Sequence, residues 1–281
     1  MTSRYILTLS CKDAHGIVAA VSGFLAANGG FITESAQFGD FSTGRFFMRT
    51  EFDAALGFAE LEGLFAPLAM QFAMEWSLYD LQRKPRVLIL VSQQGHCLND
   101  LLHRYRTGTL GVEIPAVVSN HETLKSITEW HGIPFHYLPI TPATKAVQEK
   151  ALLAEIDKLQ IDLVVLARYM QILSPDLCKA LRGRAINIHH SFLPSFKGAK
   201  PYHQAFTRGV KLIGATAHFV TEDLDEGPII EQEVARVDHT HKPEDLVSLG
   251  QDIECIVLSR ALKYYVEHRV LLNGNKTVVF K

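Results

Sequence analysis

The chain has 281 residues, which exceeds the roughly 100–200 residues of a typical domain, so two domains are expected. Hydrophobic residues make up 47% of the sequence, which is enough for buried cores. With 28 basic and 30 acidic residues and a formal charge of -2, the chain has no excess positive charge to attract nucleic acid or an anionic membrane. Neither kind of partner is expected.

The cysteines and the apolar runs indicate a cytoplasmic protein without membrane segments. The cysteines are far apart and form no C-x-x-C pair, which predicts reduced thiols; they are Cys11, Cys97, Cys178 and Cys255. The N-terminus has no charged segment leading into a long apolar run. The strongest apolar runs, such as 87–91 and 163–167, are far short of the roughly 20 residues that a spanning helix needs.

Patterns of period 2 and period 3.6 alternate over the first 80 residues. Strands are predicted at 4–10, 31–38, 44–52 and 71–80. Helices are predicted at 15–27, with Asp13 as a candidate cap, and at 57–68. The order βαββαβ predicts a ferredoxin-like α+β sandwich over residues 1–81.

Residues 82–86 form a short polar break that contains a proline, which we interpret as a linker. Strands are then predicted at 87–92, 112–118, 135–138 and 162–167. Helices are predicted between them, at 97–106, 121–131 and 143–160. The strands are continuous apolar runs, as expected where helices cover both faces of a parallel sheet. We therefore expect residues 87–281 to form a mostly parallel α/β domain.

The densest polar cluster spans residues 186–205. If 185–189 is a strand, its period of two places Asn187 and His189 on one face and His190 on the other. The strand ends before Pro194 and a glycine-containing loop, the position at which an open α/β sheet binds ligands. An isolated histidine is most often structural, but an Asn and a His that share a strand face at this edge indicate a catalytic pair.

A second cluster spans residues 214–230. Thr216, His218 and Val220 alternate as a strand that leads into an acidic turn. We interpret most acidic residues of this turn as solvated. Asp225 is the candidate for proton transfer, because a carboxylate that follows a buried strand can be desolvated, which raises its pKa.

Spacing disfavours a metal site and a dinucleotide site. The candidate metal ligands are His189, His190, His203, His218 and Asp225. Adjacent histidines on a strand diverge, and no H-x-x-x-H or cysteine pair supports them, so no metal is expected. The turn at 92–97 has one glycine where a dinucleotide fingerprint needs three, and no Walker A sequence is present. No cofactor is therefore predicted.

These clusters resemble the signature motifs of the folate-dependent formyltransferase family. Its N-x-H and S-x-L-P elements are matched by Asn187, His189, Ser191, Leu193 and Pro194. Its T-x-H-F-V and D-x-G elements are matched by Thr216, His218, Phe219, Val220, Asp225 and Gly227. The resemblance covers residues 86–281 and implies a Rossmann-like catalytic domain. The first 80 residues resemble an ACT domain, and this fusion is the arrangement of formyltetrahydrofolate deformylases.

The resemblance implies roles for individual residues. In the family, the aspartate matched by Asp225 serves proton transfer and orders water, and the residues matched by Asn187 and His189 stabilise the oxyanion at the formyl carbonyl. Main-chain groups of two loops hold the pterin in relatives, a role that tolerates a glutamine at 171 where the family often has arginine. Substrate contacts are accordingly expected at Met170, Gln171, Ile172, Leu173, His190, His218, Val220, Thr221 and Glu222.

Positions at which the chain departs from the family's pattern indicate which molecule accepts the formyl group. Glycinamide ribonucleotide formyltransferases have a turn rich in Gly and Asn that cradles a phosphate, where this chain has Gln93, Gln94, His96 and Cys97. Longer side chains hinder the close backbone approach that a phosphate needs. These transferases usually have proline in place of His190; a histidine there is suited to confine a water, although its opposite strand face favours an indirect role. The RNA-binding domain and basic surface of methionyl-tRNA formyltransferases are not predicted.

The resemblance thus implies a hydrolase acting on a formamide C–N bond, which converts 10-formyltetrahydrofolate to formate and tetrahydrofolate, balances the one-carbon folate pool and supplies formate for purine biosynthesis. The alternative is transfer of the formyl group to a small amine such as glycinamide ribonucleotide. A third hypothesis, a non-catalytic folate or amino-acid sensor, is disfavoured by the intact Asn187, His189 and Asp225.

The N-terminal domain is expected to serve regulation and assembly. In the ACT family, ligands lie near the turn that opens the first helix, here Asp13 to Gly16, so an amino-acid effector is expected there. A four-stranded sandwich of this size has sheet edges that need covering, which predicts a homo-oligomer.

Overall fold

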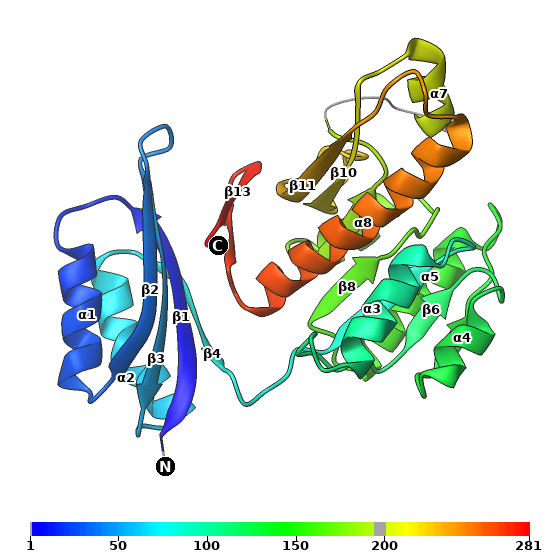
Figure 1. Cartoon of the computed structure of the whole chain (residues 1–281). Coiled ribbons are helices and arrows are strands. Elements are labelled where there is room, and N and C mark those ends of the chain that lie inside the picture. Colours follow the sequence, from blue (N-terminus) through cyan, green and yellow to red (C-terminus); the bar gives the residue numbers. More distant parts are fainter. Residues whose placement is uncertain (1, 194–200) are drawn as a thin grey trace. The chain divides into compact units, whose positions relative to one another are not determined.

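The computed structural model describes residues 2–193 and 201–281, which fold as two units (Figure 1). The N-terminal unit consists of the residues up to Lys84 together with Glu267–Asn273 and Thr277–Lys281. The central unit consists of Pro85–Val266 and Gly274–Lys276. None of the described helices is long and apolar enough to cross a membrane.

The N-terminal unit has the predicted order of elements. They are β1 (Ser3–Lys12), α1 (Ile17–Ala27), β2 (Phe31–Asp40), β3 (Arg45–Ala54), α2 (Phe58–Gln71) and β4 (Glu75–Asp80). The strands pair antiparallel in the order β2-β3-β1-β4. The strand predicted at 71–80 starts only at Glu75, because the buried stripe of Leu61, Phe65 and Ala69 continues α2 to Gln71.

One face of this sheet and the two helices enclose an apolar core. The buried side chains of α1 are Ile17, Val21 and Leu25, and they join the stripe of α2 in the same cluster. The ring of Phe65 lies edge-on between Phe24, at 5.2 Å, and Trp76, at 4.9 Å. Burial of these aromatic rings supplies much of the stabilisation of the unit, since each removes a large apolar area from water.

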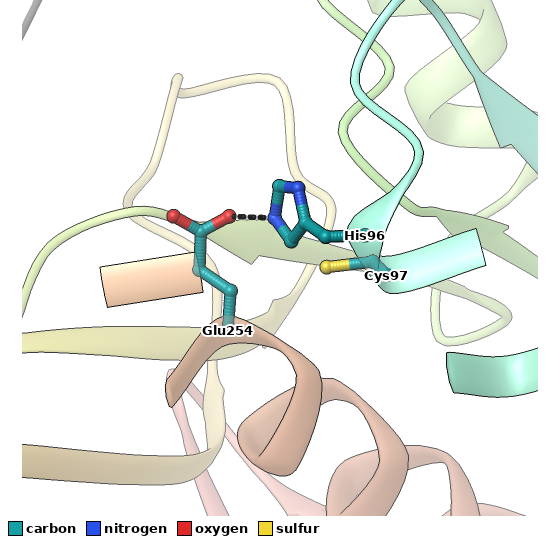
Figure 2. A group of neighbouring side chains, drawn as sticks. All are labelled: His96, Cys97 and Glu254. Carbon is teal, nitrogen blue, oxygen red and sulfur yellow. Dashed lines mark hydrogen bonds and ion pairs between the residues drawn. The ribbon is translucent and has the colours of Figure 1, made fainter. Parts of the chain in front are cut away.

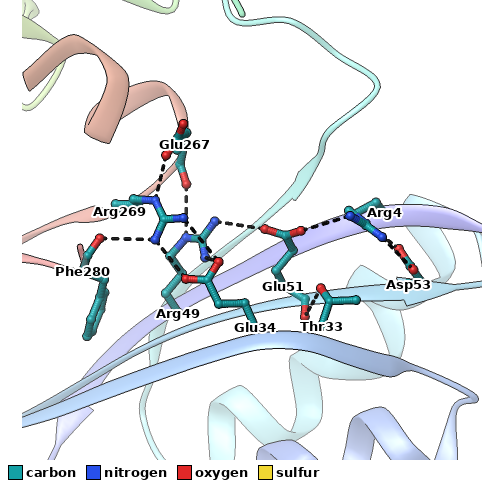
Figure 3. A network of polar contacts seen from close by, with 9 residues as sticks. All are labelled: Arg4, Thr33, Glu34, Arg49, Glu51, Asp53, Glu267, Arg269 and Phe280. Carbon is teal, nitrogen blue, oxygen red and sulfur yellow. Dashed lines mark hydrogen bonds and ion pairs between the residues drawn. The ribbon is translucent and has the colours of Figure 1, made fainter. Parts of the chain in front are cut away.

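The opposite face of the sheet contacts the end of the chain. Arg49 points to this face, and its side chain is only 1% exposed. Its Nε donates to the carbonyl oxygen of Glu267 at 3.1 Å, and its guanidinium lies 3.2 Å from the carboxylate of Glu34 (Figure 3). Arg269 binds the same carboxylate at 2.9 Å (Figure 3). A buried guanidinium needs acceptors, and the returning chain supplies one of them.

The second domain was predicted to extend to residue 281, whereas in the structure most residues after Val266 belong to the N-terminal unit. After the long helix α8 (Pro243–Val266), the chain forms a two-stranded sheet of β12 (Val270–Asn273) and β13 (Lys276–Val279). The amide of Asn273 donates to Asp40 at 2.7 Å, and the ring of His268 stacks on Tyr79. These contacts place most of the last residues in the N-terminal unit and not in the predicted domain 87–281.

The central unit is built on a mostly parallel sheet, as predicted. Its elements up to β8 are β5 (Val87–Val91), α3 (His96–Arg106), β6 (Val117–Ser119), α4 (Lys125–Trp130), β7 (Phe135–Tyr137), α5 (Lys145–Lys158) and β8 (Leu163–Leu166). They are followed by α6 (Pro175–Ala180), β9 (Ala185–His189), α7 (Pro201–Arg208), β10 (Leu212–Phe219), β11 (Ile229–Arg236) and α8. The strand order is β11-β10-β9-β8-β5-β6-β7.

Strands β5 to β9 pair in parallel, and β10 pairs antiparallel with β9 and β11. The strand predicted at 112–118 is shorter in the structure, because residues before Val117 join the sheet only through a bridge of Glu113 to Arg86. Since β6 and β8 lie on opposite sides of β5, the strand order reverses between β5 and β8. The carboxyl ends of strands beside such a reversal are where open α/β sheets bind ligands.

Helix α8, which the sequence patterns did not predict, packs against β9, β10, β11 and α3. Its buried stripe includes Ile253, Val257 and Leu258, and also the charged Glu254, which is 1% exposed. A buried carboxylate requires partners, so this glutamate marks a polar site inside the unit.

Replacing Arg49 with methionine should lower the free energy of unfolding of the N-terminal unit by about 2–4 kcal/mol, because Glu34 and the carbonyl oxygen of Glu267 lose a buried, charged donor. The matched control is Arg4→Met on the same sheet, where the side chain is 51% exposed and its ion pair with Asp53 is solvated. Urea unfolding followed by Trp76 fluorescence, with Trp130 replaced by phenylalanine, measures both. Equal losses in the two variants would contradict the structural role of Arg49.

Candidate active site

A pocket of about 260 Å³ lies at the carboxyl ends of β8 and β9. Its walls come from the loop after β8, the end of β9 and the turn after β10. The structure brings together all the residues predicted for catalysis and substrate binding; they are Met170, Gln171, Ile172, Leu173, Asn187, His189, His190, His218, Val220, Thr221, Glu222 and Asp225. The clustering supports a single site.

The pairing of β9 with β10 places Asn187 directly opposite His218. The Nδ1 atom of His218 lies 2.9 Å from the carbonyl oxygen of Phe219, which can only accept, so Nδ1 bears the hydrogen. Burial lowers the pKa of His218, which keeps the ring neutral and leaves Nε2 as an acceptor. The amide of Asn187 donates to that Nε2 at 3.3 Å and retains a second hydrogen for a ligand.

His189 and Asp225 form the second pair, with 3.2 Å between Nδ1 and the carboxylate. Burial by itself would raise the pKa of Asp225, but the hydrogen bond from His189 and the nearby histidines outweigh it, and the pKa is lowered. The prediction of a raised pKa is therefore wrong. With Asp225 ionised, His189 donates from Nδ1. Within the described part of the chain, its buried Nε2 has no hydrogen-bond partner.

Two non-glycine residues of the pocket adopt the left-handed backbone conformation. The φ angle is 64° at Arg168 and 60° at Asp225. Such strain is uncommon outside glycine and is concentrated at functional sites. A Cβ at Gly227 would collide with the carbonyl oxygen of Phe219, so only glycine lets the turn that holds Asp225 lie against the end of β10.

His190 differs from its predicted position. β9 ends at His189, so the alternation of side chains stops there and does not send His190 to the other face. Its ring stacks on that of His189, with centroids 4.8 Å apart and 19° between the planes, and it lines the same pocket. Burial, together with the charge of Arg168, lowers the pKa of His190 to about 4. His190 is therefore neutral at physiological pH.

Thr216 of β10 holds the segment that follows β9 close to β10. Its hydroxyl donates to the carbonyl oxygen of Ser191 at 2.9 Å and accepts from the backbone N–H of Leu193 at 3.1 Å. The threonine therefore holds the first part of the S-x-L-P element against β10. Pro194 and the glycine-containing loop that follows it lie outside the described residues.

Sequence reasoning missed two charged residues beside the pocket. Arg168 is 8% exposed and lines the pocket, and Glu254 on α8 lies 3.3 Å from its Nε. The signal for Glu254 was present in the sequence, because a glutamate on the apolar stripe of a helix must find a buried partner. The identity of that partner depends on tertiary contacts.

The predicted metal-ligand candidates do not form a cluster of metal-binding type among the described residues. His96, Cys97 and Glu254 do, with ligand atoms within 4.8 Å of one another (Figure 2). Glu254 already accepts from His96 Nε2 at 2.7 Å and from the hydroxyl of Tyr202 at 2.8 Å, beside Arg168. A hydrogen bond with Cys255 and burial raise the pKa of the Cys97 thiol well above its ordinary value. These features favour a satisfied ion pair over a metal centre.

The effector candidates belong to the other unit. Asp13 precedes α1, and its backbone N–H donates to the carbonyl oxygen of Gly44 at 2.9 Å. Gly16 caps α1 with a φ of 88°, a conformation that suits glycine. An effector at the start of α1 stays a prediction.

Comparisons with known proteins identify relatives over the whole chain. The formyl transferase family model matches residues 85–262. A formyltetrahydrofolate deformylase of Corynebacterium sp. (strain P-1) is 52% identical and covers 99% of this chain and 98% of its own length. The crystal structure of a formyltetrahydrofolate deformylase from Burkholderia mallei ATCC 23344 is 53% identical, covers 99% of this chain and 100% of its own, and has a TM-score of 0.96.

A more distant relative matches only part of the chain. The structure of glycinamide ribonucleotide transformylase 1 from Symbiobacterium toebii is 29% identical, with a TM-score of 0.67. The match covers 98% of that protein but 73% of this chain.

We expect His190 and His218 to be neutral at pH 6. The hydrogen should lie on Nε2 in His190, because Arg168 donates to its Nδ1, and on Nδ1 in His218. Both pKa values are lower than in an unfolded chain, near 6.5, so acid protonates the unfolded state first and stability is lost as pH falls from about 6.5 toward 4. NMR of ¹⁵N-histidine-labelled protein, assigned with His190→Gln and His218→Gln, reports both tautomers. A midpoint near 6.5 for either ring would contradict the deduced protonation.

Proposed function

The chain belongs to the formyl transferase family, and we propose that it hydrolyses 10-formyltetrahydrofolate to formate and tetrahydrofolate. The activity follows from sequence identities of 52% and 53% to formyltetrahydrofolate deformylases over the full length of the chain. The observation within the site that supports it is that Asn187, His189 and Asp225 line one pocket, where the buried Nε2 of His189 has no hydrogen-bond partner among the residues that the structure describes. An enzyme site leaves such a polar atom to be satisfied by its substrate.

The pocket suits a flat heteroaromatic ring with a polar edge. Met170 and Ile172 expose 57% and 62% of their surface and offer apolar contacts. The loop after β8 and the turn at 220–225 also offer main-chain groups to the polar edge of a pterin. We place the pterin between these segments, with the formyl group directed at Asn187 and His189.

The chemistry proceeds by addition and elimination. A water oxygen forms a bond to the formyl carbon while Asp225 accepts its proton, and the carbonyl electron pair moves onto oxygen. The second amide hydrogen of Asn187 stabilises this oxyanion, and so does Nε2–H of His189 when its ring is protonated beside the ionised Asp225. The C–N bond then breaks, N10 takes the proton from Asp225, and formic acid leaves and ionises to formate.

Water is the proposed acceptor because the turn after β5 is filled by side chains. Gln94 accepts from Arg168 at 2.9 Å, and His96 is bound to Glu254. Side chains held in this turn hinder the close backbone approach that a phosphate needs. Transfer to a small amine such as glycinamide ribonucleotide is the alternative, and the partial match to a transformylase does not favour it.

We propose that the N-terminal unit is a ferredoxin-like ACT domain that binds an amino acid near Asp13 and Gly16. The βαββαβ order and the strand order β2-β3-β1-β4 support this assignment. Strands β2 and β4 are the edges of the sheet, and their open backbone groups favour assembly into a homo-oligomer. A cytoplasmic setting agrees with the four free cysteines.

We further propose that hydrolysis needs no metal ion. The candidate ligands at the pocket are engaged with one another, as in His189 with Asp225, and Glu254 is paired with Arg168. Dialysis against a chelator should therefore leave formate release unchanged, which a formate dehydrogenase assay measures. Loss of activity that added zinc or iron restores would overturn this proposal.

Replacing Asp225 with asparagine should reduce hydrolysis by about 10²–10⁴-fold, because the amide keeps the shape but cannot accept the proton of water. Binding of the folate should remain. The matched control is Asp157→Asn on the exposed surface of α5, which should retain full activity. The measurement is formate release from 10-formyltetrahydrofolate with no amine present.

Two outcomes would contradict the proposal. If Asp225→Asn retained more than about a tenth of wild-type turnover, the role of base would be wrong, because loss of such a base has a larger effect. If added glycinamide ribonucleotide became formylated at the expense of formate, the enzyme would be a transferase.

A further inference from the structure

A buried ion pair lies beside the pocket and takes no part in the mechanism above. It joins Arg168, in the loop after β8, to Glu254 on α8, and the two side chains are 9% and 1% exposed. His96 and Tyr202 also donate to this carboxylate, at 2.7 and 2.8 Å (Figure 2 shows His96). Glu254 is thus held from three sides, and it fixes the position of the guanidinium.

Arg168 also holds two neutral side chains. Its Nε donates to Gln94, and its terminal nitrogen donates to Nδ1 of His190. A guanidinium has only donors, so Nδ1 of His190 must accept, and the single hydrogen of the neutral ring is on Nε2. Because the ring of His190 stacks on His189 and lines the pocket, this donor is held beside the reacting groups.

We propose that Arg168, anchored by Glu254, is a positioning residue that holds His190 as an uncharged Nε2–H donor to the water that attacks the formyl carbon. The inference rests on the proposed hydrolysis and extends it to residues outside the matched motifs. A water that accepts from His190 and donates to Asp225 has its remaining lone pair free to attack. An uncharged donor also leaves Asp225 as the acceptor of the proton.

A purely structural ion pair would have different consequences. Its loss would lower stability and reduce activity by a similar factor at every pH. Loss of a positioning residue instead frees the hydrogen of His190 to move to Nδ1, and this defect depends on pH because a protonated ring carries hydrogens on both nitrogens. The charged or titratable groups that face His190 are Arg168, His189, Tyr202, Asp225 and Glu254.

The test replaces Arg168 with methionine, alone and together with Glu254→Gln, which removes the unpaired buried charge if the single variant folds poorly. The exposed Arg182→Met is the matched control and should behave as wild type. At pH 8 we expect kcat for formate release to fall about 10- to 100-fold, the range for loss of one oriented proton-transfer partner, with little change in KM. The ratio of wild-type to variant kcat should shrink as pH falls toward 5.

A double-mutant cycle tests whether Arg168 acts through His190. His190→Ala should lower kcat at least as much as Arg168→Met, and His190→Gln should recover part of the loss, since its amide donates from a similar position. Arg168→Met should then have little further effect in the His190→Ala background. The proposal would be overturned if the double variant lost kcat by the full product of the two single-variant factors. It would also be overturned if the ratio of wild-type to Arg168→Met kcat were constant from pH 5 to 8.

¹⁵N NMR of His190 in wild type and in Arg168→Met separates this inference from the proposed function. We expect the Nε2–H tautomer in wild type and a mixture of tautomers in the variant. An unchanged tautomer would overturn the role of Arg168 whether or not formate is released. A wild-type protein that has the expected tautomer but releases no formate would overturn the hydrolytic function, and with it the role of His190 toward water.

Discussion

The antiparallel pairing of β9 with β10 determines the geometry of the whole pocket. The central strands pair in parallel, which would bring only carboxyl ends to one edge of the sheet. The reversed direction of β10 instead sets Asn187 opposite His218, so two polar side chains from distant parts of the chain meet across one ladder. The turn that leaves β10 then brings Asp225 to His189. A shift of one residue in this register would turn His218 to the other face and dismantle the site.

The buried polar side chains of this pocket have specific hydrogen-bond partners, and these partners determine which atoms bear the protons. His218 is neutral because burial lowers its pKa and outweighs the hydrogen bond to the carbonyl oxygen of Phe219, which by itself would raise the pKa. Asp225 is also partly buried, yet it stays ionised because His189 donates to it. Neighbouring groups thus differ in charge although all lie in the same apolar surroundings. A site that holds an ionised carboxylate beside hydrogen-bond donors is already polarised for attack by water.

Sequence periodicity correctly predicted side-chain positions that depend only on the geometry of one strand. The period of a strand was sufficient to pair Asn187 with His189, because both lie within β9. The same reasoning failed for His190, since the strand ends one residue earlier and a period of two has no meaning beyond it. Burial alone suggested a raised pKa for Asp225, but the deciding partner comes from another strand.

The other features that the sequence did not predict depend on contacts between residues far apart in the chain. The ion pair of Arg168 with Glu254 joins residues far apart in the chain, and no spacing rule connects them. The family motifs located the pocket, because they name residues directly, whereas the second layer of contacts around it lies outside any motif. The grouping of the last residues with the first domain was missed for the same reason, since it depends on the acceptors that a buried Arg49 requires.

That grouping makes the N-terminal unit discontinuous in the sequence, with consequences for biosynthesis. The ribosome produces β1 to β4 first, then Pro85–Val266 of the central unit, and only then Glu267–Asn273 of the N-terminal unit. Domains generally fold as they emerge, beginning at the N-terminus. Here the first sheet emerges with Arg49 lacking the carbonyl oxygen of Glu267, so the native contacts of Arg49 form only after Glu267 has been translated. A nascent chain that stalls before that point presents this face of the sheet to solvent and to chaperones.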